Sequence, residues 1–121
     1  MNSKKTVVIG ASPNENRYSF KAVKLLLRYS HEVIPVGIRD GIISNLEIIK
    51  GKPDIKDVHT VTMYVGSKRQ NEYYDYIISL KPERVIFNPG TENPKFYSIL
   101  KTKNIEVIQN CTLVMLNSSK F

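Results

Sequence analysis

The sequence predicts an α/β protein with a doubly wound parallel sheet, and three observations lead to this prediction. Short β-branched runs alternate with segments of helical apolar periodicity. The first run, Val7-Val8-Ile9, ends in the tight turn Gly10-Ala11-Ser12 and leads into a helical pattern. No repeat or linker divides the 121 residues, so we expect one domain over residues 1–121. Right-handed crossovers then predict three layers and five parallel strands, in the order 3-2-1-4-5.

Local patterns give the expected bounds of each element. The first helix, Arg17–Tyr29, has apolar residues at helical spacing and lysines on its other face. A second helix is capped by Ser67 and runs to about Leu80, and a third runs from Pro94 to Lys103. Residues 37–57 are expected to be irregular, and residues 113–116 a short apolar tail. The expected strands are Thr6–Ile9, Glu32–Val36, Thr60–Val65, Arg84–Phe87 and Ile105–Ile108.

Composition narrows the class of protein and its partners. The hydrophobic fraction of 41% is ordinary for a globular protein, and no apolar run approaches the roughly 20 residues of a membrane span. The start of the chain leads directly into a strand without a signal peptide, and Cys111 is the single cysteine, so we expect a reducing, cytoplasmic setting. The net charge of +7 favours an anionic partner, but the basic residues are scattered. The scattered charges are typical of a solvated basic surface, with a preference for a phosphorylated small molecule as the alternative, and nucleic acid has only the charge in its favour.

Ligands of such sheets bind beyond the carboxyl ends of the strands, so the turns there carry the candidate site. After the first strand, Gly10 permits a close turn, Ser12 offers a hydroxyl and an N–H group, and Arg17 could hold a phosphate at the next helix N-terminus. Only Gly10 matches the dinucleotide-binding glycine pattern. After the second strand, Gly37 stands where NAD-binding domains carry an acid, while Arg39 suits a ribose phosphate, as in NADP or coenzyme A.

No catalytic constellation is evident. His31 and His59 precede strands and are expected at the opposite end of the sheet. Glu92 has no partner base or nucleophile, and no metal-ligand spacing occurs. Cys111 follows the fifth strand and is interpreted as a small buried residue or, alternatively, as a thiol near the reactive end of the ligand.

These turns together resemble the small coenzyme A-binding domain family, whose larger relative is the amino-terminal domain of the succinyl-CoA synthetase alpha subunit. The resemblance covers about residues 4–117. One departure is Gly37, where the family usually has Asn after the Pro-Val pair. The matching segments are Val8-Ile9-Gly10-Ala11-Ser12, Val33-Ile34-Pro35-Val36, Gly51-Lys52-Pro53, Val61-Thr62-Met63-Tyr64-Val65, Phe87-Asn88-Pro89-Gly90-Thr91-Glu92-Asn93 and Asn110-Cys111-Thr112.

The resemblance implies a Rossmann-like domain that binds coenzyme A and assigns site residues by position. Those expected to meet the phosphates are Gly10, Ala11, Ser12, Arg17, Tyr18 and Ser19. Those expected to flank the adenosine are Pro35, Val36 and Arg39. Those expected along the adenine or pantetheine path are Tyr64 and Val65, with Pro89, Gly90 and Thr91 across from them.

The synthetase relatives carry their phosphorylated histidine in a second domain, which this chain is expected to lack. We therefore expect a standalone module that binds coenzyme A or an acyl-CoA, without catalytic residues of its own. An NADP-dependent oxidoreductase, a subunit of an acyl-CoA ligase completed by a partner chain, and a nucleic-acid-binding domain are kept as alternatives. A homo-oligomer or a partner protein is also possible.

Overall fold

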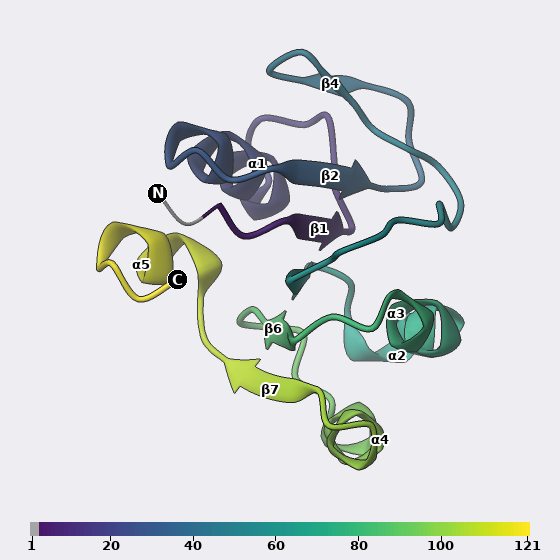
Figure 1. Cartoon of the computed structure of the whole chain (residues 1–121). Helices are drawn as coiled ribbons and strands as arrows, with labels where there is room; N and C mark the ends of the chain where they lie inside the picture. Colours follow the sequence, from purple (N-terminus) through teal and green to yellow (C-terminus); the bar gives the residue numbers. More distant parts are fainter. Residues whose placement is uncertain (1–2) are drawn as a thin grey trace.

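The computed structural model describes residues 3–121 and is built around a five-stranded parallel sheet (Figure 1). The predicted α/β class and the five predicted strands are confirmed, two of them with the predicted bounds and three with bounds that differ by one or two residues. A separate antiparallel hairpin lies in the segment after the second strand. The sheet order is β2-β1-β5-β6-β7. Its strands are β1 (Thr6–Ile9), β2 (Val33–Val36), β5 (Thr60–Met63), β6 (Arg84–Phe87) and β7 (Glu106–Gln109).

The predicted strand order, 3-2-1-4-5, was wrong. The third long strand, β5, pairs with β1 and not with β2, so that Ile9 lies between Val36 and Met63. The outer edge of β2 is instead covered by the following segment, where Ile49 N donates to Pro35 O at 2.9 Å. All four residues of β5 are buried, which suits a strand inside the sheet and not at its edge. The third turn therefore lies directly beside the first.

Helices cover both faces of the sheet, as the three-layer prediction requires (Figure 1). On one face, α1 (Tyr18–Arg28) and α5 (Thr112–Asn117) pack with Val8 and with Ile43 of the hairpin. On the other, α3 (Tyr74–Leu80) and α4 (Pro94–Thr102) pack against Val7 and Ile9. Neighbouring residues of β1 thus enter opposite cores, because side chains alternate along a strand.

Three local expectations need correction. The helix predicted from Ser67 is divided into α2 (Ser67–Gln70), a 3₁₀ turn η1 (Asn71–Tyr73) and α3, and its N-cap is Gly66 without a side-chain cap. The irregular segment contains β3 (Ile42–Ile43) and β4 (Leu46–Glu47), joined through Ser44 and Asn45 at φ 46° and 73°. Two positive-φ residues are typical of tight hairpin turns. The expected apolar tail is helix α5.

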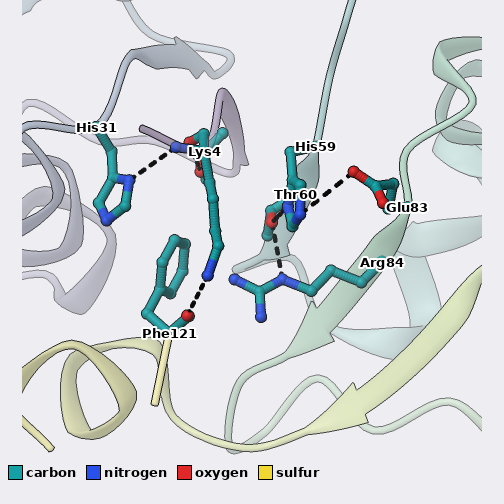
Figure 2. Close-up of polar contacts among 8 residues, drawn as sticks. Lys4, His31, His59, Thr60, Glu83, Arg84 and Phe121 are labelled. Atoms are coloured by element: carbon teal, nitrogen blue, oxygen red, sulfur yellow. Dashed lines mark hydrogen bonds and ion pairs between the residues drawn. The ribbon is translucent and has the colours of Figure 1, made fainter. Parts of the chain in front are cut away.

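At the amino ends of the strands, a polar cluster surrounds Phe121 (Figure 2). His31 Nδ1 accepts a hydrogen bond from Lys4 N at 2.9 Å, and the His31 ring lies 4.9 Å from that of Phe121. The Arg84 guanidinium lies 4.5 Å from the Phe121 ring centroid and donates to Thr60 Oγ1 at 2.8 Å. The cluster joins residues from distant parts of the chain at the amino ends of the strands.

The two histidines therefore lie at the amino end, as predicted from their positions before strands. His59 lies 2.7 Å from Thr60 Oγ1 through Nδ1 and 3.3 Å from Glu83 through Nε2. Among residues 3–121, no helix is long and apolar enough to cross a bilayer.

We predict that lowering the pH from 7.5 to 5.5 destabilises the fold. Burial lowers the pKa of both His31 and His59 from the ordinary 6.5, and for His31 the charges of Lys4 and Arg84 act in the same direction. As the pH falls below about 6.5, the unfolded chain therefore binds more protons than the folded chain does. The free energy of unfolding is then highest above about pH 6.5 and decreases below it. Urea midpoints at the two pH values measure the loss.

The variant His31→Asn retains an acceptor for Lys4 N but does not titrate, so its midpoint should depend less on pH. A wild-type midpoint that is equal or higher at pH 5.5 would contradict this account.

Candidate functional site

Two hollows lie at the carboxyl ends of the strands and meet at Tyr64. We call the first the turn pocket, with a volume of about 250 Å³. We call the second the apolar pocket, with a volume of about 260 Å³. The turn pocket is lined by Gly10, Ala11, Ser12, Arg17, Gly37, Ile38, Arg39, Tyr64, Val65, Gly66, Arg69 and Tyr73. The apolar pocket is lined by Tyr18, Tyr64, Asn88, Pro89, Cys111 and Leu113.

The shape of the turn pocket depends on two close backbone approaches. Gly10 has φ 94°, and a Cβ there would lie 2.9 Å from the carbonyl carbon and oxygen of Tyr64. At Gly37, a Cβ would overlap the carbonyl oxygen of Ala11. Only glycine fits at both positions, because a side chain would force the turns apart.

Hydrogen bonds in the first turn change its expected role. The N–H groups of Gly10 and Ala11 both donate to the carbonyl of Val36 at 2.9 Å, so they join two turns and are already used. These two N–H groups are therefore engaged within the fold, and whether Gly10 and Ala11 meet the phosphates stays a prediction. Free donors lie instead at the start of α1, whose N-cap, Arg17, makes no side-chain cap and whose first turn has no acid. Within residues 3–121, Tyr18, Ser19 and Phe20 N–H groups have no backbone acceptor.

The turn pocket is strongly basic. Arg17 lies at the N-cap of α1, Arg39 in the turn after β2 and Arg69 in α2. All three line the pocket. None of them forms an ion pair with a carboxylate in the part of the chain that the structure describes. Guanidinium groups without carboxylate partners, next to a helix N-terminus, are suited to bind phosphate.

A buried amide network forms the base of the apolar pocket. Asn88 Nδ2 donates to Thr62 Oγ1 at 2.7 Å and to Met63 O at 2.9 Å, and Asn88 Oδ1 accepts from Thr112 N at 2.8 Å. These bonds fasten α5 to the ends of β5 and β6. Burial raises the pKa of the neighbouring Tyr64 hydroxyl well above its usual value, so this side chain is neutral. Cys111 is half-buried at the N-cap of α5.

Nine of the predicted binding residues line one of the two pockets, and five do not. The nine are Gly10, Ala11, Ser12, Arg17, Tyr18, Arg39, Tyr64, Val65 and Pro89. Ser19, Val36 and Thr91 are buried, Pro35 lies within β2, and Gly90 is exposed outside both pockets. The Thr91 hydroxyl is engaged with the carbonyl of Asn88 at 2.7 Å, which explains its position. The N-cap of α4 is Asn93, whose side chain accepts from Phe96 N.

Arg69 and Leu113 are site residues that the sequence reasoning did not identify. Arg69 lies in the first turn of the helix after β5, so the rule that favours residues after strands could have found it. Leu113 was assigned to an apolar tail, and only the packing of α5 brings it to the pocket. No group of three His, Cys, Asp or Glu side chains within residues 3–121 is arranged to hold a metal ion.

These features define a Rossmann-like α/β domain with a basic pocket at its carboxyl edge. Residues 4–117 match the family model described as CoA binding domain, so the chain belongs to that family. This confirms the family expected from the turns.

Solved structures share the fold. A crystal structure of an uncharacterized protein has a TM-score of 0.97 and 46% identity, and the match covers 100% of both chains. A structure from Thermus thermophilus has a TM-score of 0.86 and 20% identity, covering 98% of this chain and 91% of that one. A conserved hypothetical protein from Pyrococcus furiosus has a TM-score of 0.80 and 25% identity, covering 92% and 97%. The curated proteins contain no significant match.

We predict that Gly37→Ala destabilises the fold by about 1–3 kcal/mol, because the new methyl group overlaps the carbonyl of Ala11. Gly66→Ala is the matched control, since a Cβ there meets nothing within 4 Å. Its effect should stay within about 0.5 kcal/mol. Urea unfolding measures both, and equal losses would show that the close approach at Gly37 does not matter.

Proposed function

We propose that this protein binds coenzyme A or an acyl-CoA as a standalone module without catalytic residues of its own. The observation that carries the proposal is the junction of two unlike pockets at Tyr64, one lined by three arginines and the other by uncharged residues. Coenzyme A has the same division between a phosphorylated nucleotide and a neutral pantetheine arm. Membership of the CoA binding domain family supports the same ligand.

The charged end of the ligand has two sources of attraction in the turn pocket. The start of α1 offers free N–H groups and the positive end of an 11-residue helix, beside Arg17. We assign the pyrophosphate to this corner. Arg39 follows β2, where a ribose lies in nucleotide-binding sheets of this kind, and we assign it to the ribose phosphate.

Arg69 approaches the same pocket from α2 and supplies a third cation. Several phosphate charges can therefore be matched without any carboxylate competing for the arginines. This arrangement accounts for recognition through charge and hydrogen bonding alone, with no covalent step.

Calorimetry with coenzyme A, dephospho-coenzyme A and NADP tests the proposal. We expect coenzyme A to bind most tightly and to lose affinity when the ribose phosphate is removed. Heat with NADP but none with coenzyme A would support the oxidoreductase alternative instead. Binding to RNA that weakens steeply with salt would support the nucleic-acid alternative.

Arg39→Ala should weaken coenzyme A at least about tenfold, because a charge-assisted contact contributes about 1.5–3 kcal/mol. The loss should be much smaller for dephospho-coenzyme A, which lacks the phosphate that Arg39 is assigned to bind. Arg28→Ala removes an equal charge from the far end of α1, outside both pockets, and serves as the control. Equal losses for the two ligands in Arg39→Ala would remove Arg39 from this role.

Arg69→Ala tests the residue that only the structure identified. We expect at least about a tenfold loss of coenzyme A affinity, since a cation that faces the phosphates is removed. Its neighbour Lys68 does not line the turn pocket, so Lys68→Ala should bind within about twofold of the wild type. Wild-type affinity in Arg69→Ala would place the phosphates elsewhere in the pocket.

A further inference from the structure

We propose that the apolar pocket selects short, uncharged acyl thioesters of coenzyme A over free coenzyme A and over acyl groups that end in a carboxylate. This inference rests on the proposed function and names the ligand class of the same site. It follows from what lines the pocket, from how its polar groups are already used, and from its size.

The lining of the apolar pocket offers no counter-ion to a carboxylate. Its side chains are uncharged, and Tyr64 stays neutral at physiological pH. Lys21 Nζ lies 5.4 Å from the Tyr18 ring centroid but lines a separate groove between α1 and α5, and the three arginines line the turn pocket. On the other side, the hollow that shares Pro89 and Cys111 contains Glu92, whose charge repels an anion. A buried carboxylate without a partner is costly.

The hydrogen-bonding groups at the base of the pocket are also committed. Both functional atoms of the Asn88 amide are bonded within the protein, and the hydroxyls of Thr62 and Thr112 lie 2.7 Å apart. A terminal carboxylate would have to break this network to gain a donor from the base of the pocket, and the Tyr18 and Tyr64 hydroxyls in the lining offer it no positive charge. An aliphatic chain needs no donor and gains by leaving water.

The size of the pocket limits the length of the acyl chain. A volume of about 260 Å³ corresponds to roughly nine water molecules at about 30 Å³ each. That space holds the thioester and a few carbons, but not a long fatty chain. The first few methylenes should therefore strengthen binding by up to about fourfold each, and further ones should add little.

Calorimetry with four ligands tests this selection: coenzyme A, butyryl-CoA, succinyl-CoA and decanoyl-CoA. Butyryl and succinyl groups have the same carbon count and differ in a terminal methyl or carboxylate, so they form a matched pair. We expect butyryl-CoA to bind at least about tenfold more tightly than coenzyme A and than succinyl-CoA. Decanoyl-CoA should gain over butyryl-CoA by clearly less than its six extra methylenes would give at about fourfold each, because the outermost carbons stay outside the pocket.

A charge placed in the pocket should change the preference. Leu113→Lys should reduce the ratio of butyryl-CoA to succinyl-CoA affinity at least about fivefold. Val114→Lys adds the same charge at the next residue of α5, which is 58% exposed and outside the pocket, and should leave the ratio unchanged. Tyr18→Lys is a second pocket variant at a position that is 68% exposed, so the test does not depend on Leu113→Lys folding.

The outcomes separate this inference from the proposed function. If folded wild-type protein binds neither coenzyme A nor any ester, the proposed function fails and the inference fails with it. If coenzyme A binds but butyryl-CoA gains nothing, or succinyl-CoA binds as well as butyryl-CoA, only the inference is overturned. Pocket variants that leave the ratio at its wild-type value overturn it as well.

Discussion

The contact of the first turn with the turns on both sides of it is the constraint on which the rest of the site depends. Gly10 lies against the backbone of Tyr64, and Gly37 lies against the carbonyl of Ala11. The carbonyl of Val36 accepts from two successive N–H groups and holds this arrangement in place. Because the three turns are in contact, side chains that follow three different strands face one pocket.

The two ends of the sheet use their polar groups differently. At the amino end, His31 accepts from Lys4 N, Lys4 Nζ donates to Phe121 O, and Arg84 donates to Thr60 and lies over the Phe121 ring, with its Nη2 buried and without a hydrogen-bond partner within residues 3–121 (Figure 2). At the carboxyl end, three arginines lack carboxylate partners within residues 3–121, and the first turn of α1 has free N–H groups. Three arginines and a helix N-terminus thus lie together where a ligand would reach the sheet.

A residue's place after a strand predicted several residues that line the two pockets, and their role in binding a ligand stays a prediction. Gly10, Arg17, Arg39 and Tyr64 all follow from that rule and line the pockets. The rule did not lead to a pocket residue where a neighbouring group already takes the hydrogen bond, as at Thr91, whose hydroxyl donates to the carbonyl of Asn88. It also failed for groups brought in by a distant element, such as Leu113 on α5.

The sequence by itself determined the α/β class, the five strands and the end of the sheet that carries the candidate site, because these follow from apolar periodicity and local turn chemistry. The tertiary structure alone decided that β5 lies beside β1, that the N–H groups of Gly10 and Ala11 are used in joining turns, and that α5 forms one wall of a pocket. The physical reason is that each of these depends on which distant groups compete for an edge, an acceptor or an apolar surface. Local patterns indicate which secondary structure a segment can form, whereas packing decides which other segment it contacts.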